Sequence, residues 1–176
     1  MYETERVGKE QEVVRFVTGY IVKNQYAPSK REIAEAIGCS LTTINTRINR
    51  MTEKGILETD SPGSSRAIRV KGTIVMAEGT SQYEKTVKKT DREIVTYVET
   101  YIMAHKYPPT YGEIAQEMEC SASRIWSRLL KLEERGIVKI GKNGAQRTIR
   151  VPWMSIIVPK TGHVRNVVPA ANTVEM

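Results

Sequence analysis

The sequence predicts a mainly α-helical protein with small β wings, organised as two winged helix-turn-helix domains in tandem. Three observations predict this fold class. The chain aligns with itself without a gap at an offset of about 81 residues. Each copy carries the signals of a helix, a helix–turn–helix and two short strands, in that order. Hydrophobic residues make up 40% but aromatic residues only 6%, which suits small helical cores better than a β-sandwich.

The two copies repeat at the scale of a small complete domain. Lys9–Val70 lies over Thr90–Val151, and about 22 of the 62 aligned positions are identical. The matched blocks include YAPSKREIAEAIGCS over YPPTYGEIAQEMECS, EKGIL over ERGIV, and SRAIRV over QRTIRV. The duplication divides the chain into a first domain (1–72), a linker (73–88), a second domain (89–152) and a C-terminal tail (153–176).

The first two helices of the first copy have separate signals. Glu12–Val22 carries its apolar residues at the 3.6-residue spacing of a helix. Ser29 is placed to cap a second helix over Lys30–Ile37, and Glu32, three residues later, completes a capping box. Gly38 closes this second helix.

The third helix follows at once and completes a helix–turn–helix. Ser40 caps it, it runs to about Lys54, and Ile44, Ile48 and Met51 form its buried face. We expect Gly55 to end it in the left-handed conformation.

Two short strands, Ile56–Thr59 and Arg66–Val70, are predicted around the turn-rich run DSPGSS and form the wing. The second copy carries the same signals: Thr110, Glu113, Ser121, Gly136 and a wing tip at Gly141–Gly144.

The C-terminal tail has β-branched runs on either side of a Thr-Gly pair. This pattern predicts a hairpin. Because Trp153 and Ile156–Val158 are strongly apolar, we expect this segment to pack on the second domain or to form a homodimer contact.

The run PSKREIAEAIG, followed by EKGIL and SRAIRV, resembles the DNA-binding domain of LexA-type repressors. The resemblance covers about 140 residues, twice over, and implies winged helices that bind double-stranded DNA. LexA repressors continue into a protease domain with a Ser–Lys dyad and an Ala–Gly cleavage site. Nothing in this sequence matches that domain, so self-cleavage and control by DNA damage are not carried over.

The second helix of a helix–turn–helix places its N-terminal part in the major groove, where side chains reach base edges. Arg124 is the best candidate for a bidentate guanine contact, which is worth about 1–3 kcal/mol of discrimination; the alternative is a solvated side chain. Arg124 aligns with Thr43 and Trp126 with Asn45, so the two helices should read different sequences. The predicted contacts are Thr42, Thr43, Asn45, Thr46, Arg47 and Arg50 in the first copy and Ser123, Arg124, Trp126, Ser127, Arg128 and Lys131 in the second.

Two of these predictions have structural alternatives. Arg47 and Arg128 either grip phosphate or pair with the equivalents of Glu32 or Glu53 to hold the fold. Trp126 stacks on a sugar, meets a thymine methyl group, or packs against the other domain.

Helix N-termini and wings supply further predicted contacts, because backbone amides and positive charge suit phosphate. Ser29 serves equally well as a plain helix cap. In the wings, Arg66 matches Arg147 and Arg69 matches Arg150. The predicted contacts are Ser29, Lys30, Arg31, Thr110 and Tyr111 at helix starts and Ser65, Arg66, Lys142 and Arg147 in the wings.

The charge balance favours a polyanionic partner. Lys and Arg outnumber Asp and Glu by 27 to 20, and residues 1–72 and 85–152 carry about +3 and +5. Nucleic acid is the commonest partner for such a surplus, and an anionic membrane surface the next. Without an apolar run of about 18 residues, no membrane span is expected, and we expect a cytoplasmic protein.

The two cysteines and two histidines lack the spacing of a disulfide framework or a metal site. No nucleophile–base set or phosphate-binding glycine loop is recognisable either. We therefore expect no metal, no cofactor and no enzymatic activity.

Three functions fit the sequence. The leading hypothesis is a transcription regulator whose two winged helices read adjacent, non-identical half-sites of double-stranded DNA. A repressor is favoured over an activator. A replication-initiation or partition protein of a plasmid or phage has the same requirements. A protein-interaction module is the third, favoured by the apolar changes at Trp126 and Leu130.

Overall fold

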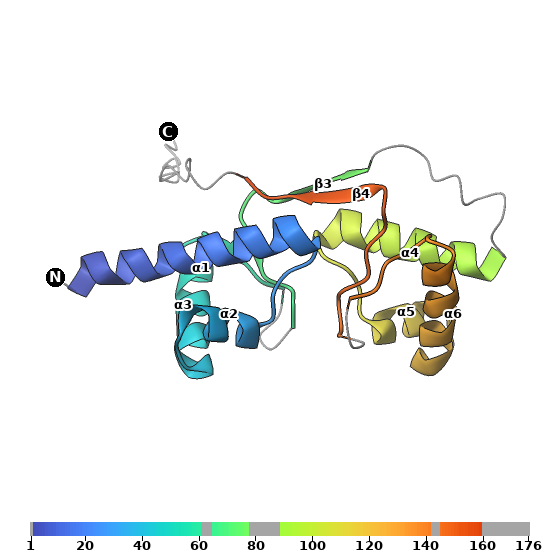
Figure 1. Ribbon diagram of the computed structural model, residues 1–176, viewed down its shortest axis with the longest axis horizontal. Helices are drawn as coiled ribbons and strands as arrows, with labels where there is room; N and C mark the ends of the chain where they lie inside the picture. The colour runs from blue at the N-terminus through green and yellow to red at the C-terminus, as the bar shows by residue number, and fades with distance from the viewer. Residues whose placement is uncertain (1, 61–64, 78–88, 142–144, 160–176) are drawn as a thin grey trace, which may run out of the picture.

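The computed structural model describes residues 2–60, 65–77, 89–141 and 145–159. It confirms the predicted fold class, two winged-helix domains in tandem (Figure 1). The wing tip residue Lys142 and tail residues 160–176 lie outside the described residues. The helices are α1 (Tyr2–Asn24), α2 (Lys30–Ile37), α3 (Leu41–Glu53), α4 (Lys89–His105), α5 (Tyr111–Glu117) and α6 (Ala122–Glu134), and the strands are β1 (Leu57–Glu58), β2 (Arg69–Val70), β3 (Ile74–Ala77) and β4 (Met154–Ile157).

Both predicted capping boxes are present and fix where α2 and α5 begin. The Ser29 hydroxyl accepts from the Glu32 amide at 3.2 Å, and the Glu32 carboxylate accepts from the Ser29 amide at 2.6 Å. Thr110 and Glu113 repeat this arrangement in the second domain. Gly38 ends α2 with φ of 68°, in the left-handed region where glycine carries no steric penalty.

Helix α1 is longer than the sequence predicts, because it begins at Tyr2 rather than near Glu12. The apolar periodicity starts at Val13 and gives no sign of the extension. A buried ion pair attaches the added turns to the domain: Glu10 accepts from Arg50 at 2.8 Å and from Lys54 at 3.0 Å, both at the end of α3.

The wings are shorter than predicted. In the first domain β1 and β2 pair antiparallel, with Leu57 opposite Val70 and Glu58 opposite Arg69. In the second domain the described residues of the wing form a single bridge between Lys139 and Arg150, which stand 81 residues after Glu58 and Arg69. The two wings therefore share one register.

A third strand pair joins the two domains. β3 lies in the segment predicted to be a linker, and β4 lies in the tail. They pair antiparallel with each other, Val75 opposite Ile156 and Ala77 opposite Met154. The rest of the predicted tail hairpin, from residue 160 on, lies outside the described residues. The pairing of these two strands was not predicted from the sequence, because it depends on how the two domains face each other.

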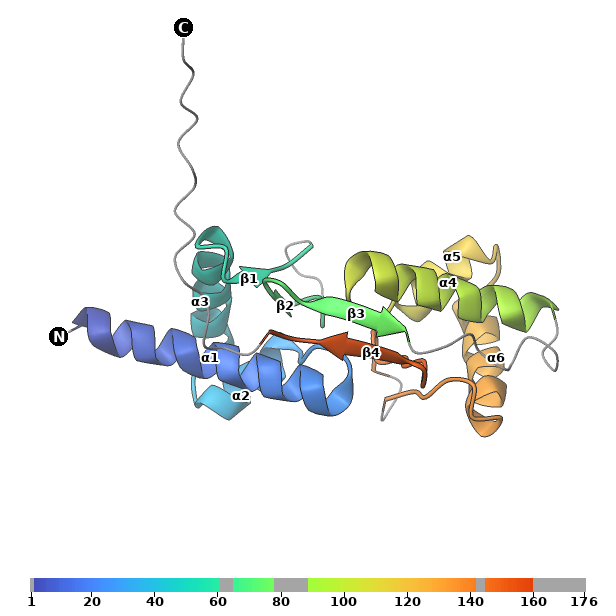
Figure 2. The ribbon, with the colours of Figure 1, turned by 90° about the horizontal axis from the view of Figure 1, so that it is seen from above.

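The register of β3 and β4 defines a pseudo-twofold axis. Val75 and Ile156 follow the aligned part of the repeat at the same offset of 81 residues, and they face each other across the sheet. A rotation that exchanges the domains must exchange counterparts, so the axis passes through this pair. Figure 2, viewed from above the sheet, shows the result: α3 and α6 lie at diagonally opposite corners of the molecule.

The strand pair also connects the two hydrophobic cores. Ile156 and Val158, from beyond the second domain, are buried in the core of the first. Met154 belongs to the core of the second domain, and Val75 packs against both cores. The Ile156 amide donates to the Gln25 side chain at the end of α1 at 2.6 Å. The tail that follows the second domain therefore supplies part of the core of the first.

We predict that Ile156→Ala destabilises the first domain, although residue 156 follows the second. Ile156 is 6% exposed, and truncating a buried isoleucine to alanine costs about 2–5 kcal/mol. Hydrogen exchange of the α1–α3 amides should accelerate. Ile157→Ala is the matched control, because Ile157 is 39% exposed and its loss should change exchange little. Equal effects of the two variants would contradict the shared core.

Candidate nucleic-acid interface

Helix α3 presents polar side chains on the side away from its core. Ser40 caps the helix by accepting from the Thr43 amide at 3.1 Å, and Ile44, Ile48 and Met51 are buried. Figure 1 shows α2 and α3 on the same side of the molecule as α5 and α6, opposite the β3–β4 sheet. The predicted contact residues are exposed or half-buried: Thr42, Thr43, Asn45, Thr46, Arg47 and Arg50.

Helix α6 exposes a different set of side chains. Ser123, Arg124, Ser127 and Lys131 are all exposed. Trp126 is half-buried and packs edge-on against Tyr111 of the same domain, with ring centroids 5.1 Å apart. Tyr111 stands in the first turn of α5, so Trp126 packs within its own domain.

The arginines of the two helices differ in whether they are paired. Arg50 binds Glu10 of α1 at 2.8 Å, and Arg128 binds Asp91 of α4 at 2.9 Å. Their partners lie on the first helix of each domain, not at the equivalents of Glu32 or Glu53. Arg47, the counterpart of Arg128, has a buried Nη1 without a hydrogen-bond partner. This buried nitrogen of Arg47 thus has no acceptor among the described residues, whereas Arg128 is engaged within its domain.

Arg66 and Arg147 lie inside their domains. Arg66 binds Glu32 at 2.8 Å and donates to the Tyr20 hydroxyl at 3.2 Å and the Ala27 carbonyl at 3.1 Å. Arg147 makes the corresponding contacts with Glu113, Tyr101 and Pro108. Both arginines have positive φ, 57° and 56°, a conformation that side chains adopt rarely. These bonds stabilise the turn into the second wing strand in each domain.

This network shifts the pKa values of its members. Burial alone would raise the pKa of Glu32, but Arg66 and the amide and hydroxyl of Ser29 outweigh it and lower the pKa. The pKa of Glu113 is lowered in the same way by the Thr110 amide and Arg147, against burial. Burial raises the pKa of Tyr20 to about 12. All the carboxylates of the network are therefore ionised at neutral pH.

The remaining predicted residues are divided between structure and surface. Ser29 and Thr110 act as helix caps, and Tyr111 is buried. Arg31 and Ser65 are exposed, and Lys30 is half-buried.

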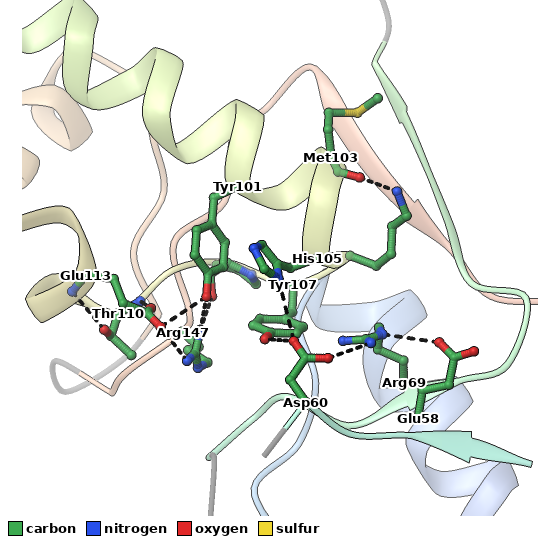
Figure 3. A network of polar contacts seen from close by, with 12 residues as sticks. Glu58, Asp60, Arg69, Tyr101, Met103, His105, Tyr107, Thr110, Glu113 and Arg147 are labelled. Carbon is green, nitrogen blue, oxygen red and sulfur yellow. Dashed lines mark hydrogen bonds and ion pairs between the residues drawn. The ribbon is translucent and has the colours of Figure 1, made fainter. Parts of the chain in front are cut away.

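A junction between the domains was not predicted from the sequence (Figure 3). Asp60 of the first wing accepts from Arg69 at 2.7 Å and from the Tyr107 hydroxyl of the second domain. The Arg69 guanidinium stands 5.3 Å from the centroid of the Tyr107 ring, and Arg147 stands 4.8 Å from it. Tyr107 is therefore held between one arginine of each wing.

The same stack recurs on the other side of the axis. Tyr26 lies 5.4 Å from Arg66 of its own wing and 5.9 Å from Arg150 of the opposite wing, measured from guanidinium carbon to ring centroid. The identical tyrosines and arginines at counterpart positions were the available signal in the sequence. Sequence alone did not show that each tyrosine contacts both wings.

We predict that acid destabilises the fold through these carboxylates. A carboxyl whose pKa is lower in the folded than in the unfolded chain stabilises the fold fully above the unfolded value. That contribution is lost as the pH falls through the folded value, so the thermal midpoint should drop below about pH 4.5, the ordinary pKa of Glu32 and Glu113.

The variant that tests this effect is Glu113→Gln. It should lower the thermal midpoint at pH 7, because Arg147 loses its ion pair, and it should reduce the further loss in acid. Glu117→Gln, at an exposed position of the same helix, is the control and should match the unmodified protein at every pH. An unchanged pH profile for Glu113→Gln would contradict the assignment.

Within the described residues, no helix is long and apolar enough to cross a membrane. No group of three or more His, Cys, Asp or Glu side chains in that part of the chain is arranged to hold a metal ion.

Known proteins similar to this chain share its domain type. LexA repressors from Acetivibrio thermocellus and Ruminiclostridium cellulolyticum are 35% and 36% identical over 63 residues, which is 35% of this chain and 29% of theirs. The LexA repressor of Clostridium botulinum is 35% identical over 66 residues, 37% of this chain and 32% of its own. This chain thus spans less than a third of the length of these relatives.

A family model for the LexA DNA binding domain matches the chain twice, over residues 5–67 and 85–148. These two matches coincide with the two winged helices of the structure and together cover more than half of the sequence. The chain belongs to the LexA DNA-binding domain family, with two copies of the domain in one polypeptide.

Proposed function

We propose that this protein is a transcription regulator that binds double-stranded DNA in a sequence-specific manner. Repression is the leading form of regulation in this proposal. One chain covers two half-sites through α3 and α6. The observation that carries the proposal is the pseudo-twofold axis through Val75 and Ile156, together with the placement of both helix–turn–helix units opposite the β3–β4 sheet.

The axis has a consequence for the DNA site. Two-fold related helices meet a duplex in opposite directions, so the half-sites should be inverted relative to each other rather than directly repeated. The similar LexA repressors support the regulatory role, since their names describe repressors.

The half-sites should differ in sequence. Thr43 and Asn45 of α3 are replaced by Arg124 and Trp126 in α6, and Trp126 is used for packing. The proposed contact set leaves out residues engaged within their own domain. It consists of Thr42, Thr43, Asn45, Thr46 and Arg47 on α3 and Ser123, Arg124, Ser127 and Lys131 on α6, with phosphate contacts from Lys30, Arg31, Ser65 and Lys142.

One chain suffices as the binding unit. β4 is used within the chain, so two domains are already held together without a homodimer. Native mass spectrometry of the complex should therefore show one protein chain per duplex. Two chains per duplex would favour the homodimer expected from the tail.

Replication initiation or partition would use the same interface and differ only in where the sites lie in a genome. The protein-interaction alternative loses part of its support, because Trp126 packs inside its own domain.

We predict that selection from random duplex DNA enriches two unlike, inverted half-sites, bound less tightly as salt rises. Failure to enrich any sequence, with binding lost at physiological salt, would contradict the proposal. Enriched direct repeats would contradict the role of the axis.

We predict that Arg124→Ala weakens discrimination at one half-site by about 1–3 kcal/mol, roughly 5- to 150-fold. The preferences at the other half-site serve as the internal control and should not change. The reciprocal variant Thr43→Arg should shift the first half-site towards the sequence of the second. Competition binding with single-base substitutions in each half-site measures both effects.

A further inference from the structure

The two wings carry opposite charge around the same arginine. Arg69 and Arg150 are counterparts, and their cross-strand partners are Glu58 and Lys139. Asp60 has Gly141 as its counterpart. The first wing therefore surrounds its arginine with two carboxylates, and the second wing places a lysine opposite it.

In the first wing the arginine is neutralised. Arg69 binds Asp60 at 2.7 Å and Glu58 at 3.4 Å, and its side chain is only 14% exposed. These ion pairs raise the pKa of Arg69 even though burial alone would lower it. Figure 3 shows Arg69 lying between the two carboxylates. The described part of this wing therefore offers no free positive charge at its base.

In the second wing the arginine lacks a counter-charge. No ion pair joins Arg150 to a carboxylate of the described residues, and its buried Nε has no hydrogen-bond partner. Lys139 and Arg150 exchange backbone hydrogen bonds at 2.8 and 2.7 Å, so their side chains leave the same face of the wing. Like charges directly opposite each other are destabilising unless an anion joins them.

A carboxylate at position 141 is excluded by packing. A Cβ on Gly141 would come within 2.5 Å of the Thr148 Cβ. The Thr148 hydroxyl fills this space, accepting from the Gly141 amide at 3.2 Å and donating to the Ala145 carbonyl at 2.7 Å. In the first wing the counterpart of Thr148 is Ala67. The packing of Thr148 against Gly141 thus explains why the second wing has no carboxylate at the position of Asp60.

We propose that Lys139 and Arg150 form a site for a DNA backbone phosphate, which the first wing does not have. Lys139 is exposed and Arg150 partly exposed, so an anion has access to both. The phosphate belongs to the stretch between the two half-sites, because Arg150 also stacks on Tyr26 across the pseudo-twofold axis. Such a contact adds affinity without reading bases, and it makes the second domain the stronger anchor. This inference rests on the proposed function.

The test uses the full chain, the duplex enriched by selection, and affinity measured over a range of salt. Each phosphate contact contributes about 0.9 to the slope of log affinity against log salt. One contact therefore accounts for roughly a 3-fold loss between about 50 and 200 mM salt. Lys139→Gln should reduce the slope by about 0.9, the share of one phosphate contact. Lys139→Glu should reduce the slope by about twice as much, because the new carboxylate also pairs with Arg150 as Glu58 pairs with Arg69.

Glu58→Gln is the matched control at the counterpart position. Both positions are exposed, so the variants should fold, and thermal unfolding checks this. Glu58→Gln should not reduce the slope. A slope for Lys139→Glu equal to that of the unmodified protein would overturn the proposal, as would equal losses in both wings.

Two further outcomes are distinguishable. If the unmodified protein enriches no sequence at all, the proposed function fails as well. If enrichment succeeds and Arg124→Ala behaves as expected, an unchanged slope for Lys139→Glu overturns the phosphate site alone.

A second experiment measures the thermal midpoint of the free protein with and without inorganic phosphate at constant ionic strength. Stabilisation that Lys139→Glu abolishes, without a change in the DNA slope, would show a site for free anions and overturn the DNA assignment.

Discussion

The pairing of β3 with β4 is the interaction on which the rest of the structure depends. Two strands of four residues form at best a marginal sheet in water. This one is stabilised because its inward side chains complete the helical cores: Ile156 is buried in the first domain, Met154 in the second, and Val75 packs against both. The strands cannot separate without opening both cores. The distance between α3 and α6 is therefore fixed by hydrophobic packing.

The arginine–tyrosine stacks around the wings make a second connection between the domains. Arg69 reaches Tyr107 and Arg150 reaches Tyr26, so each wing contacts the domain it does not belong to. With connections at both the sheet and the wings, the domains resist rotation about the strands. Because both helices belong to one rigid chain, binding costs translational and rotational freedom once. Two separate domains would each lose that freedom on binding.

The features predicted from the sequence were those encoded within a few residues. Ser29 with Glu32, Ser40, Gly38 and the apolar stripe of α3 predicted their elements correctly, because caps and periodicity are local. The β3–β4 pair joins residues about 80 positions apart, and only the docked domains bring them together. The first turns of α1 were missed for a similar reason, since Glu10 is held by Arg50 and Lys54 of a distant helix. Such pairings leave no periodic signal.

The two copies are identical at positions that join the domains and differ at positions of the proposed DNA interface. Tyr26, Arg66 and Arg69 are identical to their counterparts, and all three lie in the stacks between the domains. Thr43 and its counterpart Arg124 differ, and they project from the outer face of the helices. The exchange of Asp60 for Gly141 is an intermediate case, because Thr148, which stands in place of Ala67, occupies the space that a side chain at position 141 would take. At the junction this exchange therefore occurs together with the exchange of a neighbouring residue. The arginine–tyrosine stacks of the junction are therefore shared by the two domains, while the proposed DNA-reading positions differ between them.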